Sequence, residues 1–91
     1  FDVIDPADES IISAVPDHGP ADADHAVEAA RSAAPAWRAR SSRERSDVLL
    51  RAFDIMMSRR DELAALISRE NGKARADALA EVAYAAEYFR W

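Results

Sequence analysis

The sequence contains no cysteine, and this absence excludes several kinds of chemistry. Without a thiol, the chain has no disulfide to stabilise its fold, no thiolate nucleophile and no thiolate ligand for a metal. Its redox compartment is therefore left undetermined. Ninety-one residues form one small domain at most, and a chain of this size buries little more than ~60% of the surface that its unfolded form exposes.

The sequence has fewer positive than negative side chains. Twelve lysines and arginines stand against 17 aspartates and glutamates, which gives a net charge of −5. We therefore expect no general attraction for nucleic-acid phosphates or anionic lipids, and we predict neither a nucleic-acid nor a membrane partner. No apolar run approaches the ~20 residues that cross a bilayer, and the N-terminus lacks the pattern of a secretory signal. The default expectation is a cytoplasmic protein.

Glycine occurs only twice, whereas 49% of the residues are apolar and many of these are alanine, so most of the chain is expected to be helical. Two short β-branched runs, residues 1–4 and 11–15, flank a turn-forming segment rich in Asp, Pro and Ser. They predict a β-hairpin over residues 1–16, which Pro16 ends. The predicted fold class is mainly α, with a short N-terminal β-hairpin followed by four helices.

The first helix is predicted over residues 20–34. Gly19 is the candidate N-cap, Pro20 suits the first helical position, and Asp22 suits the positive first turn. Pro35 is expected to end the helix, because proline lacks a backbone donor. A narrow buried face is expected along its small apolar residues, which are Ala23, Ala26, Val27, Ala30, Ala33 and Ala34.

The second helix is predicted over residues 42–58, because Ser41 and Glu44 fit a capping box. Its expected core face consists of Val48, Leu49, Ala52, Phe53, Ile55 and Met56. A third helix is predicted over residues 60–71, with Gly72 as a left-handed C-cap. Its apolar side is expected to hold Leu63, Leu66 and Ile67, together with Glu70.

The fourth helix is predicted over residues 74–91 and carries an aromatic stripe. Tyr84, Tyr88 and Trp91 fall at positions i, i+4 and i+7, and no Gly, Asn or Pro follows to close the helix. Such a stripe is normally covered by further chain, so we expect these residues to be the front end of a larger protein. The alternative is a free-standing helical interaction module that binds a partner through the aromatic face of residues 84–91.

No catalytic or metal site is predicted within these residues. Acidic and histidine side chains gather near the start of the first helix, at Asp17, His18, Asp22, Asp24, His25 and Glu28. The aspartates suit the helix dipole, and the glycine that a calcium loop requires is missing, so a solvated helix start is the favoured interpretation. Gly72 and Lys73 lack the rest of a phosphate-binding loop.

The charged groups of the last helix, Glu81, Glu87 and Arg90, have no histidine or nucleophile nearby and are interpreted as solvated. Ordinary surface charge is also expected for the arginines of the second helix and of its junction with the third. These are Arg43, Arg45, Arg51, Arg59 and Arg60.

A series of short motifs runs through the chain in a fixed order. They are Asp5-Pro6-Ala7 before Glu9 and Ile11-Ile12, Val15-Pro16-Asp17, Ala33 through Trp37-Arg38, Arg45 before Leu49-Leu50, Asp61-Glu62-Leu63-Ala64, Glu70-Asn71-Gly72-Lys73, and Glu81-Val82 ahead of Ala85-Ala86-Glu87-Tyr88-Phe89-Arg90-Trp91. In order and spacing, the series resembles the N-terminal part of NAD(P)-dependent aldehyde dehydrogenases, over essentially the whole chain. Residues 85–91 look most like the succinate-semialdehyde dehydrogenase branch. Two departures, Asp5 where the family commonly has Asn and Asn71 where it commonly has Thr, keep turn- and cap-forming residues.

The resemblance implies a parent protein several times longer, with the α/β aldehyde dehydrogenase fold, a Rossmann-type cofactor domain, a catalytic domain and an oligomerisation arm. Such a parent oxidises an aldehyde, for example succinate semialdehyde, to a carboxylic acid with NAD or NADP. It assembles as a homo-oligomer, a dimer or tetramer. The family's catalytic cysteine, oxyanion asparagine and glutamate have no counterpart here, so the fragment alone is expected to bind no cofactor and to be inactive.

The main partner of these residues is then the remainder of their own polypeptide. In some relatives, the helix that matches the one with Glu81 borders the substrate entrance. The resemblance therefore implies that Asp77, Glu81 and Tyr84 are substrate-entrance residues.

Overall fold

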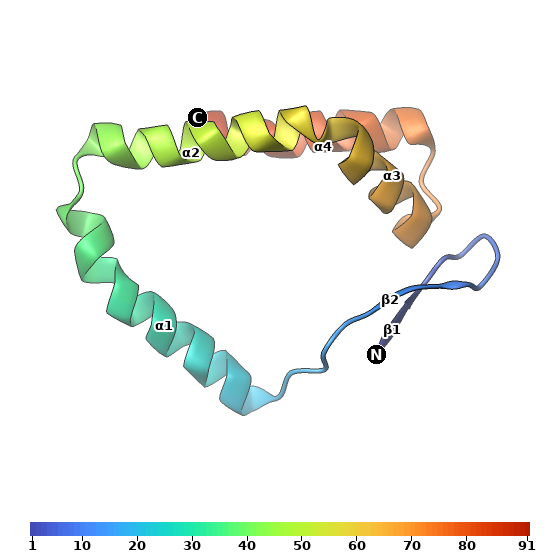
Figure 1. Ribbon diagram of the computed structural model, residues 1–91, viewed down its shortest axis with the longest axis horizontal. Coiled ribbons are helices and arrows are strands. Elements are labelled where there is room, and N and C mark those ends of the chain that lie inside the picture. Colours follow the sequence, from blue (N-terminus) through green and yellow to red (C-terminus); the bar gives the residue numbers. More distant parts are fainter.

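The computed structural model describes residues 1–91 as an open, flat arrangement that measures 49 × 33 × 14 Å (Figure 1). The elements follow in the order β1 (Asp2–Ile4), β2 (Ile11–Ala14), α1 (Pro20–Ala39), α2 (Ser42–Ser58), α3 (Arg60–Asn71) and α4 (Arg75–Arg90). This confirms the predicted class of four helices after a short β-hairpin. None of the helices combines the length and the apolar character that crossing a membrane requires.

The hairpin is antiparallel, with Val3 opposite Ser13, and a register shift follows Val3. Asp5 closes the turn twice, because its backbone N–H donates to the Ser10 carbonyl at 2.9 Å and its carboxylate accepts from the Ala7 N–H at 2.9 Å. Glu9 takes the left-handed conformation (φ 61°) that lets the chain reverse.

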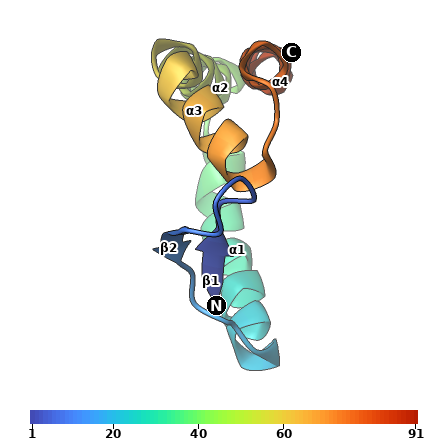
Figure 2. The same cartoon turned by 90° about the vertical axis from the view of Figure 1, so that its right-hand side faces the viewer.

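The tip of the hairpin lies beside the α3–α4 connection (Figures 1 and 2). A Cβ added at Gly72 would lie 3.3 Å from Cγ of Pro6, and the Arg69 Nε lies 3.9 Å from a carboxylate oxygen of Asp5. The tip of the hairpin therefore contacts α3 and the connection that follows it, while most residues of its two strands are exposed.

Helix α1 extends to Ala39, so the predicted end at residue 34 was wrong. Pro35 lies inside the helix. Its fixed φ is compatible with a helix, and its missing N–H deprives only the carbonyl of Arg31, four residues earlier. Every residue of α1 except Ala34 is exposed, so solvent can supply the missing hydrogen bond, and the helix continues until the Arg40 N–H donates to the Trp37 carbonyl at 3.3 Å.

The predicted buried face of α1 was also wrong. No residue of α1 is buried, and Val27 is 60% exposed. The reason is the direction of the helix: α1 runs away from the layer of α2 and α4, and apart from its last turns near Trp37 it has no extended packing against another helix (Figure 1). Its alanine stripe therefore has nothing to pack on within these residues.

The core lies where α4 crosses α2 and α3. Ala64, Ala78 and Val82 are buried together, and the partly buried Leu63, Ile67 and Leu79 pack against them. Ala86 is also buried, one turn further along α4. Small side chains at these crossings allow the helix backbones to approach closely, which explains why three helices share so small a core.

The predicted apolar face of α2 is only partly correct. Phe53 and Met56 are half-buried, whereas Val48, Leu49 and Ile55 remain 40–50% exposed. On α3, Leu66 is likewise 43% exposed. These side chains carry the right periodicity, but only α4 covers them, and one neighbouring helix cannot cover the whole apolar stripe.

The helix ends follow the sequence closely. The Ser41 hydroxyl accepts from the Glu44 N–H at 3.2 Å, and the Glu44 carboxylate accepts from the Ser41 N–H at 2.8 Å, which confirms the capping box. The Ser41 hydroxyl also donates to the Glu44 carboxylate at 2.8 Å, and this hydrogen bond, together with the one from the Ser41 N–H, holds the pKa of Glu44 below its ordinary value. Gly72 is left-handed (φ 68°), and its N–H donates to Ser68 at 2.8 Å. Helices α2 and α3 have their predicted bounds, and α4 begins one residue later and ends one residue earlier than predicted.

Candidate functional site

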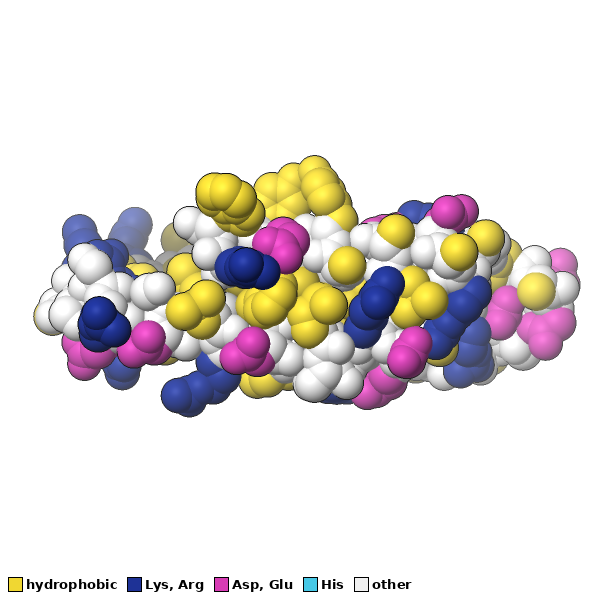
Figure 3. All heavy atoms as spheres, turned by 90° about the horizontal axis from the view of Figure 1, so that it is seen from above, with side chains coloured by type: hydrophobic (Ala, Val, Ile, Leu, Met, Phe, Trp, Pro, Cys, Tyr) yellow, Lys and Arg dark blue, Asp and Glu magenta, His cyan; other side chains and the backbone are white.

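One face of α4 carries the three candidate entrance residues and the aromatic stripe. We call it the α4 outer face and define it as Asp77, Glu81, Tyr84, Tyr88 and Trp91. These positions repeat every three or four residues, so they form a single line along the helix. The opposite side of α4 provides the buried residues Ala78, Val82 and Ala86. In Figure 3, apolar side chains stand out from one edge of the helical layer.

The N-terminal half of the α4 outer face is acidic. Glu81 forms an ion pair with Lys73, and both side chains remain more than a third exposed. Asp77 lies in the first turn of α4, where its charge suits the helix dipole, and it has no side-chain partner. This half therefore presents one neutralised carboxylate and one free carboxylate.

The C-terminal half of the α4 outer face is aromatic. The rings of Tyr84 and Tyr88 meet edge to face, with centroids 5.2 Å apart and an interplanar angle of 88°. Their hydroxyl groups are hydrogen-bonded to each other, and this bond raises the pKa of Tyr88. Tyr84, Tyr88 and Trp91 are 66%, 67% and 100% exposed, and with Glu87 they line a shallow apolar hollow.

This arrangement can bind an apolar surface, but it contains no catalytic group. No histidine or hydroxyl nucleophile with an adjacent base lies on the α4 outer face, and the nearby Glu87 pairs with Arg90 at 3.5 Å. The structure thus brings Asp77, Glu81 and Tyr84 onto one line without assembling reactive chemistry around them.

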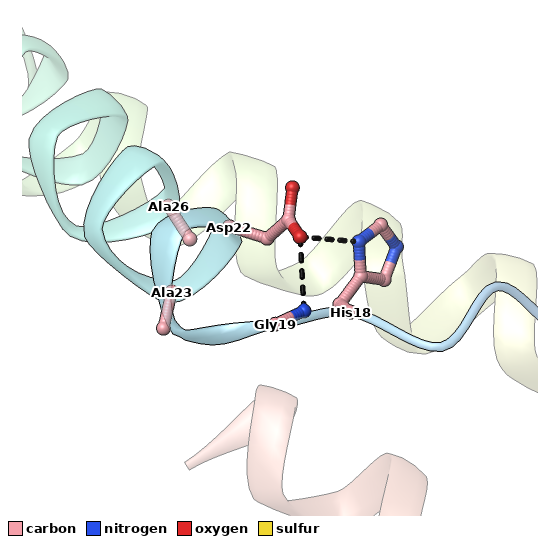
Figure 4. Close-up of a pocket in the computed structure, with 5 residues that line it drawn as sticks. All are labelled: His18, Gly19, Asp22, Ala23 and Ala26. Carbon is pink, nitrogen blue, oxygen red and sulfur yellow. Dashed lines mark hydrogen bonds and ion pairs between the residues drawn. The ribbon is translucent and has the colours of Figure 1, made fainter.

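A second hollow lies at the start of α1, lined by His18, Gly19, Asp22, Ala23 and Ala26 (Figure 4). A carboxylate oxygen of Asp22 accepts from the Gly19 N–H at 3.0 Å and lies 3.4 Å from Nδ1 of His18.

Further along α1, the Glu28 carboxylate is engaged by Ser32 at 3.5 Å and by Arg31 at 3.7 Å. No group of three potential ligands gathers anywhere in the chain. The acidic and histidine residues of this segment are exposed.

Two of the arginines assigned to ordinary surface charge are half-buried. The Arg60 Nε donates to the Leu79 carbonyl at 3.2 Å and so links α3 to α4. Arg45 is half-buried with no side-chain partner, and its Nε atom is enclosed. The mixed charges around these arginines in the sequence do not indicate burial, because the burial of Arg45 depends on where α1 and α4 lie. Arg59, by contrast, is an exposed partner of Glu62.

The hairpin and four helices, in this order, define a known class of protein. The family model described as "Aldehyde dehydrogenase family" matches residues 1–91, and the chain belongs to this family. The resemblance seen in the sequence motifs is therefore confirmed.

Two relatives with high sequence identity to this chain are semialdehyde dehydrogenases. The chain is 46% identical over 89 residues to the glutarate-semialdehyde dehydrogenase of Pseudomonas aeruginosa. It is 40% identical over 91 residues to the NADP(+) succinate-semialdehyde dehydrogenase GabD of Escherichia coli. These alignments cover 98% and 100% of this chain but only 18% and 19% of the two relatives. The chain thus spans less than a fifth of their length.

Solved structures show the same fold. The crystal structure of the succinate-semialdehyde dehydrogenase from Burkholderia pseudomallei superposes with a TM-score of 0.96 at 40% identity. An NADP-dependent enzyme of E. coli also gives a TM-score of 0.96 at 40% identity. The matches cover 100% and 99% of this chain and 19% of each neighbour. The open arrangement in Figure 1 is therefore the form that this segment takes in much larger proteins.

Proposed function

We propose that the protein carrying these residues is an NAD(P)-dependent dehydrogenase that oxidises the semialdehyde of a short dicarboxylic acid to the dicarboxylate. The observation that supports it is the agreement among the relatives: 46% and 45% identity to two glutarate-semialdehyde dehydrogenases and 40% to a succinate-semialdehyde dehydrogenase. Both substrates have an aldehyde at one end and a carboxylate at the other. The cofactor proposal covers NAD and NADP, since the E. coli and yeast relatives are named for NADP(+).

Within this proposal, residues 1–91 have a structural role, and the chemistry comes from the remaining polypeptide. The sequence contains no cysteine to attack an aldehyde, and the α4 outer face has no base beside a nucleophile. We further propose that Asp77, Glu81 and Tyr84 border the substrate entrance. A carboxylate-bearing substrate is repelled by nearby negative charge, so the pairing of Glu81 with Lys73 would weaken that repulsion. The cytoplasmic location and the dimeric or tetrameric assembly remain predictions.

The test is a steady-state assay of the full-length gene product with NAD and with NADP. Succinate and glutarate semialdehydes are compared with butanal and pentanal, which have the same chain lengths but no carboxylate. We expect kcat/KM to be on the order of 100-fold higher for a semialdehyde, because a site built to pair a carboxylate is left unsatisfied by its apolar analogue. Residues 1–91 expressed alone should reduce neither cofactor.

Equal kcat/KM values for the semialdehydes and the simple aldehydes would refute the substrate proposal. Reduction of either cofactor by residues 1–91 would refute the structural role. The free-standing module, which was the alternative from the sequence, receives no specific support, because the exposed stripe is also what a segment of a larger enzyme would show.

A further inference from the structure

The chain exposes more surface than a folded monomer of its mass should. Its accessible surface is 7112 Å² for 10.0 kDa. The scaling for compact monomers gives about 5200 Å² at this mass, so roughly 1900 Å² is in excess. A standard protein–protein interface buries about 1600 Å² over both partners. Each partner contributes about 800 Å² of that total, so the excess on this chain is more than twice one partner's share of a standard interface.

Part of the excess surface forms a groove between the α1–α2 junction and the end of α4. We call it the arginine groove. Its walls carry four large apolar side chains and two arginines, which are Trp37, Leu49, Phe89, Trp91, Arg45 and Arg90. Trp37 and Leu49 are 38% and 41% exposed, and Trp91 is fully exposed. Three helices meet here, but no side chain fills the space between them.

Arg45 is the unusual member of this groove. The side chain is half-buried, its Nε atom is enclosed, and its guanidinium makes no hydrogen bond or ion pair with any of the 91 residues. Enclosed polar atoms in folded proteins nearly always have a partner, and a carboxylate can engage Nε and a terminal nitrogen of one arginine together. Arg45 therefore lacks an acceptor that the complete protein would be expected to provide.

None of the neighbouring charged groups of this chain pairs with Arg45. Arg90 pairs with Glu87 at 3.5 Å and lies 5.5 Å from the centre of the Phe53 ring, so its charge is partly compensated. No carboxylate of this chain approaches Arg45, although the chain as a whole carries a net charge of −5. The groove is thus a positive, apolar-walled site on a negative molecule.

We propose that the arginine groove holds an acidic segment of the same polypeptide, from outside residues 1–91. One carboxylate of that segment accepts hydrogen bonds from the Arg45 guanidinium, and its apolar neighbours pack on Trp37, Leu49 and Trp91. The proposal rests on the proposed function, since relatives about five times as long supply such a segment. The enclosed Nε favours a permanent partner over a transient one, because separating the pair would leave this atom without an acceptor.

The experiment compares variants of the full-length protein. Arg45→Met keeps the apolar stem of the side chain and removes its charge, and Arg43→Met makes the same change at an exposed position of α2. We expect the midpoint of thermal unfolding to fall by several degrees for R45M and to stay unchanged for R43M. R45K should lie between R45M and the wild type, since lysine restores the charge but not the two-pronged hydrogen bonding.

An R45M midpoint equal to or above that of the wild type would overturn the proposal, because removing an unpartnered buried charge is not destabilising. If R45M fails to fold, a structure of the wild-type full-length protein decides: a protein carboxylate within 4.0 Å of the Arg45 guanidinium supports the proposal, and a water molecule, a backbone carbonyl or a second copy overturns it. Stabilisation by added acetate in the wild type but not in R45M would point to a free carboxylate and would also overturn it.

These readouts do not depend on aldehyde oxidation. If the protein oxidises semialdehydes but R45M does not destabilise it, the proposed function is supported and the acidic segment in the arginine groove is refuted. If R45M destabilises the protein but no semialdehyde is oxidised, the acidic segment is supported and the proposed function is refuted.

Discussion

Val82 is the one large side chain at the centre of the small core, so its truncation should be the most informative test of the packing. It is 3% exposed and is grouped with the buried alanines Ala64 and Ala78. Val82→Ala removes two buried methyl groups, and at about 0.8 kcal/mol each, with an added term for the cavity, the loss is about 2 kcal/mol. Alanine returns about 0.5 kcal/mol through its higher helix propensity. The expected net destabilisation is therefore about 1.5 kcal/mol.

The matched control is Val27→Ala on α1. Val27 is 60% exposed on the part of α1 that lies away from the other helices, so the same change should only improve helix propensity. We expect V27A to be neutral or to stabilise the chain by up to about 0.5 kcal/mol. The two variants have the same composition, and only the environment of the valine differs.

The assay is urea unfolding of residues 1–91, followed by far-ultraviolet circular dichroism. The midpoint should fall for V82A with an unchanged slope, which identifies a change in stability and not in the unfolded state. Equal midpoints for V82A and V27A would refute the assignment of the core. The absence of any cooperative transition in the wild-type chain would show that α2, α3 and α4 do not hold together without further protein.

Two further changes test individual positions. Gly72→Ala should destabilise residues 1–91 by about 1–2 kcal/mol, because φ of Gly72 is 68° and the new Cβ would lie 3.3 Å from Pro6. The control is Gly19→Ala, which should be close to neutral because φ of Gly19 is −91° and no atom lies near the new Cβ. Similar melting temperatures for the two variants would contradict this prediction. Tyr84→Phe should lower the pKa of Tyr88 towards its ordinary value of 10.0, as measured by ultraviolet titration of the phenol, and an unchanged Tyr88 titration would contradict the hydroxyl contact. Since the folded pKa of Tyr88 is raised, its contribution to stability is present below pH 10.0 and is lost as the pH rises through the folded value, so Y84F should reduce that alkaline loss.

Local rules predicted the starts and ends of most helices. The Ser41–Glu44 capping box and the left-handed Gly72 act within a few residues of chain, so their hydrogen bonds are readable from the sequence. Pro35 was the exception. A proline inside a helix is disfavoured by local rules, but α1 is exposed around Pro35, and solvent can supply the hydrogen bond that the proline cannot donate.

Burial could not be predicted in the same way. The alanine stripe of α1 and the apolar residues of α2 have the periodicity of core faces, but α1 remains uncovered and α2 is covered only in part. The spacing of apolar residues indicates that a helix face is suited to burial, and only the positions of other elements decide whether that face is covered. Among the candidate entrance residues, the sequence placed Asp77, Glu81 and Tyr84 on one line, whereas the pairing of Glu81 with Lys73 required the turn of chain between α3 and α4.

The sequence by itself determined the helical class, the capped helix ends and the family, because these depend on local hydrogen bonding and on motifs in a fixed order. Tertiary structure alone decided which apolar residues are buried and that Arg45 is enclosed without an acceptor. The core arises where α4 crosses α2 and α3, and Arg45 lies in the hollow that α1, α2 and α4 line, so the solvation of each side chain is set by neighbours that lie far from it along the chain.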